Sequence, residues 1–363
     1  MQQDFMTGLF FELLRSGIGT GSELSATPTA TQWEELFELS KRQTLVGIAF
    51  TGIEKLPAAQ RPPKELLLKW YNHCQIIEKQ NKILNRQAVA VAKKFKEEGF
   101  GNIILKGQGI ATLYPNPLRR TPGDIDIWLD ADRKSIMDYV RKFVPNAEPI
   151  YHHVDYPIFK EPCIEIHFTP SWMYSFFTNR RLQSFFEREK TVQLNNKVIL
   201  GEEGCITAPT LAFNRVYILL HIYRHLFQEG IGLRQMLDYY YVLAQGFTKE
   251  ELKRTLTHLK ELKMLRFAGA AMYVLKKVYG LDSLFFIAEP LEKEGEELLG
   301  EIMRKGNFGN NNPELDIQKN GNLLQRAFSR TKQNFALVRS YPSETLWAPL
   351  FRGWHFFWMR MNK

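Results

Sequence analysis

Cysteine is scarce in this sequence of 363 residues, and the three that occur, Cys74, Cys163 and Cys205, are far apart. None forms a C-x-x-C pair, so the sequence offers neither a disulfide framework nor a cysteine zinc site and suits a reducing compartment. Long apolar runs are missing as well, and none approaches the roughly 18 residues of a spanning helix. The first residues lack the basic and apolar segments of a signal peptide. We therefore expect a cytoplasmic protein without a transmembrane segment.

Low-complexity tracts are also absent, whereas positive charge is in excess. The chain carries a formal net charge of +9 with a pI of about 9.3, and 44% of its residues are hydrophobic. A chain of this length and composition buries a substantial core and divides into two or three domains. Its basic character favours anionic ligands such as nucleotides, sugar phosphates or nucleic acid. Nucleic acid ranks last, because no concentrated Lys/Arg run is present.

Several familiar catalytic motifs are missing. There is no Ser-His-Asp arrangement or nucleophile elbow, and Gly107-x-Gly109 lacks the third glycine of a dinucleotide fingerprint. His221 and His225 share one face of an expected helix, but the residues between them lack the glutamate of a zinc protease. We interpret this pair as histidines packed at a domain interface, or in the wall of a cleft.

Two short apolar runs contain the features that point to chemistry. The first, Ile103–Leu105, ends at Lys106-Gly107, and the second contains Gly123-Asp124-Ile125-Asp126. Alternate residues of a strand share a face, so the two aspartates point the same way with Cα atoms about 6.5–7 Å apart. Two anions held so close repel each other unless a divalent cation lies between them. The pair therefore predicts a Mg²⁺ site.

A third carboxylate lies on a later alternating run, 163–168, in which Glu165 and His167 share a face. If this run pairs beside the first acidic strand, Glu165 joins Asp124 and Asp126. Three such acids can hold two metal ions that activate a hydroxyl and neutralise a phosphate. His167 is expected to orient Glu165 or touch substrate, since Mg²⁺ prefers oxygen ligands. The alternative is an acidic strand edge that keeps sheets from pairing wrongly.

Basic side chains surround these acids in the sequence. Arg119 and Arg120 lie between the two apolar runs, and their guanidinium groups suit bidentate binding of phosphate. His152 and His153 are adjacent. On a strand they would face opposite sides and could not both serve one site, so we interpret them as surface or lining residues.

The order of these features resembles the nucleotidyltransferases of the DNA polymerase beta superfamily, and within it a bacterial family of nucleotidyltransferases. The segments with this resemblance are Leu105–Gly107, Leu113–Pro115, Arg120–Asp126 and Ile164–Phe168. It is specific from about residue 100 to 170. Around His221, His225 and the run Arg234–Asp238 it is weaker.

The resemblance implies a Mg²⁺-dependent nucleotidyltransferase with two metal ions, for which Mn²⁺ could substitute. It would move a nucleoside monophosphate from an NTP, with ATP expected, to an unknown hydroxyl acceptor and release pyrophosphate. The implied catalytic and metal-binding residues are Asp124, Asp126 and Glu165. The implied nucleotide-binding residues are Lys106, Gly107, Gln108, Arg120 and Gly123. Residues expected to support the metal ligands or line the cleft are His167, His221, His225, Arg234 and Asp238.

One departure from the superfamily pattern concerns the phosphates. Many members have Gly-Ser or Gly-Gly where this chain has Gly107-Gln108, so the serine hydroxyl that contacts phosphate is missing. Lys106 or backbone N–H groups would have to substitute. The departure motivates an alternative function, a catalytically silent nucleotide-binding or regulatory protein on the same fold.

The expected fold class is α+β, a nucleotidyltransferase-like mixed sheet with helices, flanked by helical domains at both ends. We expect a helical region over 1–98, the nucleotidyltransferase core over 99–204 and a helical domain over 205–363. Expected strands cover 102–106, 124–129, 150–159 and 162–168, followed by a hairpin whose turn is at 195–197. Expected helices include 64–98, 108–114, 132–143, 173–189, 209–227, 231–245, 249–263, 264–279 and 291–305.

Three further expectations concern single features of the chain. Thr31 is expected to cap the helix that follows it. The Asn-rich stretch 306–313 is the strongest loop signal. The aromatic C-terminus, which includes Phe351 and Trp354, is expected to dock onto the core. The alternative for it is an interfacial membrane anchor.

Overall fold

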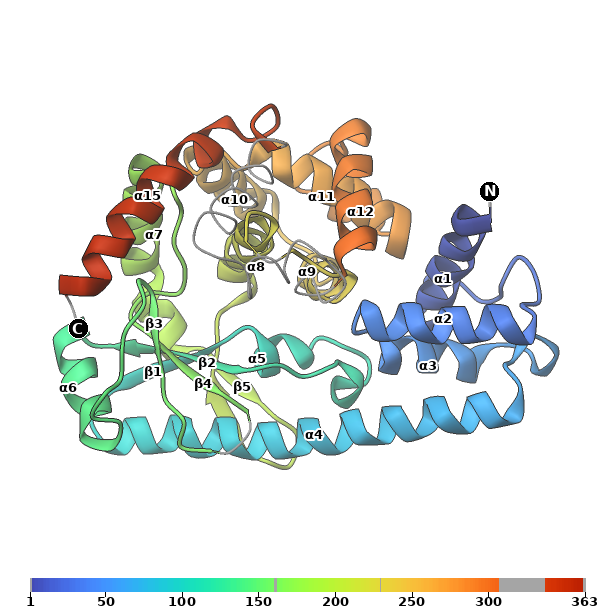
Figure 1. Cartoon of the computed structure of the whole chain (residues 1–363), viewed down its shortest axis with the longest axis horizontal. Coiled ribbons are helices and arrows are strands. Elements are labelled where there is room, and N and C mark those ends of the chain that lie inside the picture. The colour runs from blue at the N-terminus through green and yellow to red at the C-terminus, as the bar shows by residue number, and fades with distance from the viewer. Residues whose placement is uncertain (1, 160–161, 229, 307–336, 362–363) are drawn as a thin grey trace.

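The computed structural model describes residues 2–159, 162–228, 230–306 and 337–361. It is an α+β protein, as the sequence predicted, in which one small mixed sheet is surrounded by helices (Figure 1). The boundaries expected near residues 98 and 204 stay predictions.

The N-terminal part is helical, and its longest element extends under the whole molecule (Figure 1). The helices are α1 (Gln2–Ile18), α2 (Ala30–Arg42), α3 (Val46–Lys55), the 3-10 turn η1 (Ala58–Gln60) and α4 (Lys64–Glu97). The 34 residues of α4 bury an apolar stripe that contributes to two core clusters. Trp70 and Cys74 belong to one cluster, and Val91 and Phe95 belong to the other.

The cap of α2 is Thr29 and not Thr31. The Thr29 hydroxyl accepts from the backbone N–H of Gln32, and the Gln32 side chain accepts from the backbone N–H of Thr29. This reciprocal pair satisfies two helix-terminal donors at once, which a threonine inside the first turn cannot do.

Helices α1 and α3 pack so closely that Gly52 contacts the backbone of α1. A Cβ atom at Gly52 would collide with the carbonyl oxygen of Leu13, whereas one at Gly8 in α1 would meet nothing within 4 Å. We expect Gly52→Ala to lower the free energy of unfolding by roughly 1–3 kcal/mol, because two backbones must separate. Gly8→Ala should raise it by about 0.5–1 kcal/mol. Urea denaturation of both variants measures this difference, and equal effects would contradict the packing.

The central sheet has the strand order β1-β2-β4-β3. Its strands are β1 (Gly101–Leu105), β2 (Ile125–Asp130), β3 (His153–Asp155) and β4 (Ile164–His167). Strand β2 pairs antiparallel with β1 and parallel with β4, and β3 pairs antiparallel with β4. Short elements follow β1 and β2, namely α5 (Gly107–Ala111), η2 (Pro117–Arg119) and α6 (Arg133–Phe143). The expected strands and helices of this region are therefore present; β1 and β2 are shifted by one residue, and the others are shorter than expected.

The two faces of the sheet differ in the way that the alternating pattern predicts. Ile125, Ile127 and Leu129 of β2 are buried in the cluster shared with α4 and α6. On the opposite face, Trp128 packs against aromatic rings of α7 (Phe176–Asn195) and α8 (Leu211–Leu226). Asp126, two residues earlier, has only 6% of its surface exposed. A covered apolar face and a polar, partly open face are thus both set by period-two alternation.

The hairpin expected around residues 195–197 is wrong. Its expected first arm, residues 192–194, belongs to helix α7 (Phe176–Asn195), and the two-stranded ribbon is formed by β5 (Lys197–Ile199) with β6 (Cys205–Thr207). Gln193 explains the difference, because it is fully buried and its Oε1 accepts from the backbone N–H of Thr210, which caps the next helix. Long-range packing therefore overrides an alternating pattern only three residues long.

The C-terminal part is helical, as predicted. Its elements are α8 (Leu211–Leu226), α9 (Leu233–Ala244), α10 (Lys249–Glu261), α11 (Leu265–Tyr279), η3 (Ser283–Phe285), α12 (Glu292–Lys305) and α15 (Pro342–Met361). Apart from Gly306, the loop expected over 306–313 lies outside the described residues.

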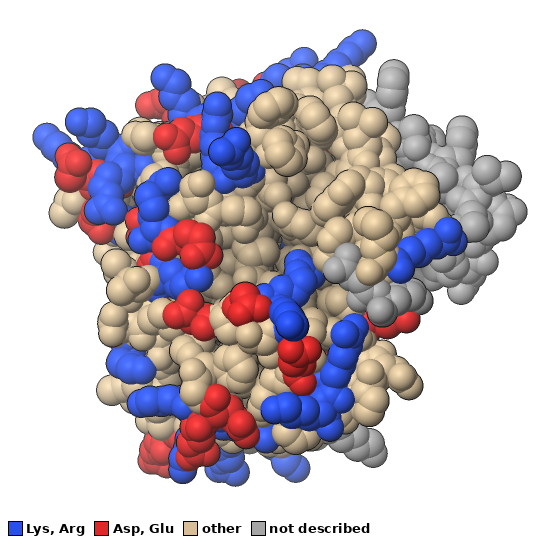
Figure 2. Space-filling model, turned by 90° about the vertical axis from the view of Figure 1, so that its left-hand side faces the viewer, with Lys and Arg blue, Asp and Glu red and all other residues tan. Residues whose placement is uncertain are grey.

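The aromatic C-terminus docks on one side and is exposed on the other. The ring of Phe351 in α15 stacks on Trp172 with centroids 4.4 Å apart, as expected for docking. Trp354 and Phe357 are 47% and 63% exposed. Figure 2 shows the side of the molecule where α15 lies. Basic and acidic side chains are interspersed along one edge of this face, and a broad neighbouring area carries no charged side chains. Within the described residues, no helix combines the length and apolar character needed to cross a membrane.

Candidate active site

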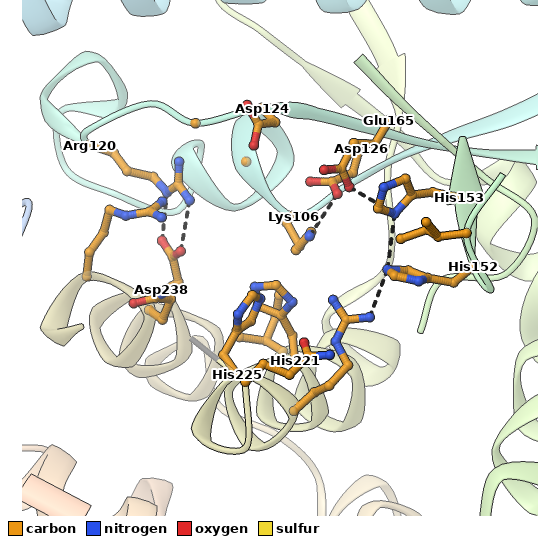
Figure 3. Close-up of a pocket in the computed structure, with 18 residues that line it drawn as sticks. Lys106, Arg120, Asp124, Asp126, His152, His153, Glu165, His221, His225 and Asp238 are labelled. Atoms are coloured by element: carbon orange, nitrogen blue, oxygen red, sulfur yellow. Dashed lines mark hydrogen bonds and ion pairs between the residues drawn. The ribbon is translucent and has the colours of Figure 1, made fainter. Parts of the chain in front are cut away.

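A cleft of about 420 Å³ separates the polar face of the sheet from helices α8 and α9. Its lining residues are Lys106, Gly107, Arg120, Gly123, Asp124, Asp126, Ile150, His152, His153, Glu165, Ile218, His221, Arg224, His225, Gln228, Arg234, Gln235 and Asp238. The acids lie along the sheet, and the paired histidines of α8 point toward them from the other wall (Figure 3).

The three predicted acids converge in this cleft. Asp126 of β2 and Glu165 of β4 are direct partners in the parallel register, so their side chains lie next to each other on one face. Asp124 precedes the first residue of β2 and is exposed in the cleft. The sheet therefore brings together carboxylates that are about forty residues apart in the chain, through one strand pair.

Electrostatics differ sharply between the two aspartates. Burial raises the pKa of Asp124, and the negative charges of Glu165 and Asp126 raise it further. Asp126 is more deeply buried, but the charge of Lys106 and a hydrogen bond from His167 hold its pKa well below the usual range. The distances from Asp126 Oδ1 are 2.8 Å to Lys106 Nζ and 2.9 Å to His167 Nε2. The Asp124 end is thus the part of the trio whose negative charge is least compensated.

Lys106 reaches Asp126 from a sharp turn between β1 and α5. It adopts a φ of 51°, a left-handed conformation that is unusual for a residue with a side chain, and Gly107 follows with a φ of 31°. Such backbone strain is typical of functional turns, because the surrounding structure has to hold it. The turn directs the ammonium group of Lys106 into the cleft, where it pairs with Asp126 (Figure 3).

Histidines surround Glu165. Its Oε2 lies 3.3 Å from His153 Nδ1 and 3.4 Å from His167 Nε2. Each of the three residues offers one potential ligand atom within 4.8 Å of the other two. Burial lowers the pKa of His153 to about 4, so this ring is neutral at neutral pH. The pKa of Glu165 is lowered: burial and the charge of Asp126 raise it, but the hydrogen bond and the charge of His167 outweigh them. Glu165 is therefore ionised at neutral pH.

His152 and His153 both line the cleft, contrary to the expectation that they cannot serve one site. The reason is that β3 begins only at His153, so His152 lies in a bend where strand alternation does not apply. Trp172 Nε1 lies 3.1 Å from His152 Nδ1, and Arg224 Nη1 lies 2.9 Å from its Nε2.

Arg120 and Asp238 form a buried ion pair at the other end of the cleft (Figure 3). Arg120 Nε and Nη2 donate to the two oxygens of Asp238 at 2.7 and 2.9 Å, and the hydroxyl of Tyr114 donates to Asp238 at 2.7 Å. Arg119 instead pairs with Glu78 at 3.0 Å and with Glu54, and it does not line the cleft. The phosphate-directed role of Arg120 stays a prediction, since much of its guanidinium is held by Asp238.

The helical wall is rich in basic groups. His221 and His225 of α8 have ring centroids 4.4 Å apart, and Arg224 and Arg234 lie in the same wall. Burial lowers the pKa of His221 well below its ordinary value, and the charges of Lys106 and of these neighbours lower it further. The His221 ring is therefore neutral, and the cations of this wall are its arginines; arginines opposite a carboxylate cluster suit a polyanion bound through metal ions.

Two residues of the predicted set do not line the cleft. The side chain of Gln108 is buried in α5 with 2% exposed, so a direct nucleotide contact does not fit its position. His167 lies beneath Asp126, 1% exposed, where a supporting role fits. Sequence reasoning gave no role to Tyr114, Arg224 or Gln235. The signals that could have indicated two of them were the positions of Tyr114 and Gln235 inside the resembling segments.

The residues of this cleft belong to a segment that is similar to a known protein family. A family described as uncharacterised nucleotidyltransferases matches residues 29–280, a span that includes every candidate residue of the cleft. The chain belongs to this family. It is therefore assigned as a nucleotidyltransferase, which acts on a nucleotide substrate.

Among solved structures, this nucleotidyltransferase has only low similarity to the protein described next. An antigenic nucleotidyltransferase-like protein from Paracoccidioides brasiliensis matches with 15% identity and a TM-score of 0.34, over 59% of this chain and 96% of its own. At that TM-score the likeness shows neither a shared site nor a shared activity. No curated protein matches this chain.

Proposed function

We propose that this protein transfers a nucleoside monophosphate from an NTP, ATP being the expected donor, to a hydroxyl acceptor, with release of pyrophosphate. The observation that supports this most directly is the cross-strand pairing of Asp126 with Glu165, beside Asp124, on the wall of an open cleft. An acidic edge that only prevents wrong sheet pairing would not need a cleft of about 420 Å³ or an opposite wall of basic side chains.

The donor set fits divalent metal ions. Asp124, Asp126 and Glu165 offer carboxylate oxygens, which Mg²⁺ prefers. Burial and mutual repulsion raise the pKa of Asp124, and a cation between the acids relieves that repulsion. His153 adds a nitrogen donor next to Glu165, which suits Mn²⁺ as a substitute. When bound, two such ions neutralise the transferring phosphate and lower the pKa of the acceptor hydroxyl.

The protein residues supply positioning and proton transfer. Lys106 and His167 fix the carboxylate of Asp126 through its Oδ1. Glu165, ionised at neutral pH, accepts the proton of the acceptor hydroxyl, whose oxygen then attacks the α-phosphorus in line while pyrophosphate leaves. Gly107 and Gly123 line the cleft without side chains, so phosphate oxygens can approach the backbone. Arg120, oriented by Asp238, lines the same cleft and offers its remaining N–H groups to phosphate.

The experiment that tests the proposal is a screen of the purified protein with labelled NTPs and Mg²⁺ or Mn²⁺. Pooled proteins, antibiotics, sugars, nucleotides and RNA ends serve as acceptors, and pyrophosphate release is measured. Metal-dependent release together with a labelled acceptor is the expected result. NTP binding without transfer to any acceptor would favour the regulatory nucleotide-binding protein, for which the buried Gln108 in place of a phosphate-binding serine is the supporting observation.

A further inference from the structure

The first turn of α9 places two adjacent polar side chains in the wall of the cleft. Arg234 and Gln235 both line it, and they are only 7% and 2% exposed. Buried polar groups in proteins almost always have hydrogen-bond partners, and buried charges are paired. The partners of these two side chains therefore indicate whether they serve the fold or a ligand.

Arg234 lacks a counterion of its own. The nearest acid on its helix is Asp238, and both oxygens of that carboxylate are taken by Arg120. Among the described residues no hydrogen bond reaches the Arg234 guanidinium, and its Nε is buried without a partner. Burial, together with the charge of Arg120, lowers the pKa of Arg234 to about 10. An uncompensated buried cation destabilises the fold, so its presence at the cleft indicates an anionic ligand.

Gln235 is held in one orientation. Its Oε1 accepts from the backbone N–H of Gly232 at 2.7 Å, which fixes the amide and leaves Nε2 as the free end. Nε2 is buried and has no partner within the described part of the chain. The positive end of the α9 dipole lies at the same turn, so the helix, the amide and the guanidinium all favour negative charge there.

The opposite wall explains what this anion should be. Lys106 is engaged by Asp126 at 2.8 Å, and Gln108, which replaces the phosphate-binding serine, is buried away from the cleft. The turn after β1 therefore lacks the side-chain grip on the phosphates that the superfamily resemblance implies. Arg234 and Asp124 line the same cleft, and the charge of Arg234 acts on that carboxylate, so an anion held by Arg234 lies near the acids.

We propose that Arg234 and Gln235, at the N-terminus of α9, bind the β- and γ-phosphates of the nucleotide and then the departing pyrophosphate. The assignment of the anion rests on the function proposed above. The planar fork of an arginine binds two phosphate oxygens at once, and the amide of Gln235 donates to a third. The helical wall thereby takes over the phosphate contact that the Gly107-Gln108 turn does not provide.

Calorimetric titration with Mg²⁺ in excess tests this site, with ATP, AMP and inorganic tripolyphosphate as probes. The wild type should bind ATP more tightly than AMP. Arg234→Met should weaken ATP and tripolyphosphate binding by at least about 30-fold and leave AMP binding unchanged, because two charge-assisted hydrogen bonds are lost. Arg234→Lys should restore part of the loss. Arg254→Met, an exposed arginine of α10 outside the cleft, is the matched control and should change nothing.

Gln235→Glu is a second variant that keeps the fold. A glutamate retains the oxygen that accepts from Gly232 but replaces the donor in the cleft with a negative charge. Tripolyphosphate binding should weaken, while the melting temperature without ligand should stay close to that of the wild type. Unchanged tripolyphosphate binding by both Arg234→Met and Gln235→Glu overturns the assignment.

Thermal melting separates a ligand site from a structural arginine. Without ligand, Arg234→Met should melt no lower than the wild type, since it removes an unpaired buried cation. Tripolyphosphate should raise the melting temperature of the wild type but not that of the variant. A clear loss of melting temperature in the ligand-free variant contradicts the inference. Binding of tripolyphosphate through Arg234 without any nucleotidyl transfer would instead remove the proposed function and leave the anion site standing.

Discussion

Asp124→Asn is expected to abolish nucleotidyl transfer, with a fall in the rate of pyrophosphate release of at least about 1,000-fold. The substitution removes one negative charge from the carboxylate cluster and leaves the volume of the side chain nearly unchanged. Asp124 is exposed in the cleft and forms no ion pair with the described residues, so the fold should survive. The measurement is pyrophosphate release with Mg²⁺ and with Mn²⁺, together with calorimetric binding of the metal–ATP complex.

Asp130→Asn is the matched control for this prediction. Asp130 ends the same strand β2, is exposed, and pairs with Lys190 at 3.2 Å away from the cleft. The control should keep wild-type activity. Asp126→Asn is less informative, because it also removes the negative charge that pairs with Lys106 and His167. Unchanged metal–ATP affinity and transfer in Asp124→Asn would show that these carboxylates are not the metal site.

The acids were predictable because their arrangement is local. Asp124 and Asp126 are separated by one buried isoleucine, and Glu165 lies between two, so period-two alternation alone puts each set on one face. Only the pairing of β2 with β4 had to be assumed, and the register Asp126↔Glu165 agrees with that assumption. Strong short-range periodicity therefore sufficed for this wall of the cleft.

The helical wall could not be derived in the same way. Arg234 and Asp238 are four residues apart in the chain. This spacing is common on buried and on exposed helix faces, so it does not reveal the function of either residue. Their meaning depends on Arg120, which precedes Asp238 by 118 residues in the chain. Tertiary packing decides that Asp238 pairs with Arg120, and that Arg234 is left for a ligand. Sequence reasoning placed both residues near the cleft without finding this division of roles.

The wrong prediction of a hairpin around residues 195–197 has the same origin. The stretch 192–194 alternates like a strand, but its central residue is needed as a buried partner for the start of α8. Likewise, His152 serves the cleft only because the chain bends before β3. An alternating pattern of three or four residues is too short to determine the secondary structure when long-range contacts favour another conformation.

Asp238→Ala is expected to lower the free energy of unfolding by about 3–5 kcal/mol, because breaking a buried ion pair leaves an uncompensated charge. Arg120 would lose both of its partners on this carboxylate, Tyr114 would lose its acceptor, and Arg234 would lose the nearest negative charge on its helix. Urea denaturation measures the change. Asp138→Ala, at an exposed position of α6, is the control and should shift stability by no more than about 0.5 kcal/mol.

The effect of Asp238 should also depend on pH in one direction. Burial raises the pKa of Asp238, but the charge and hydrogen bonds of Arg120 outweigh this and hold it below the ordinary 3.8. A carboxyl whose folded-state pKa is lowered stabilises the protein above its unfolded pKa and loses that contribution as the pH falls through the folded value. The difference between wild type and Asp238→Ala should therefore be constant near neutral pH and shrink below about pH 4. A loss under about 1 kcal/mol at neutral pH, or a difference that grows on acidification, would mean that this ion pair does not join the helical wall to the sheet.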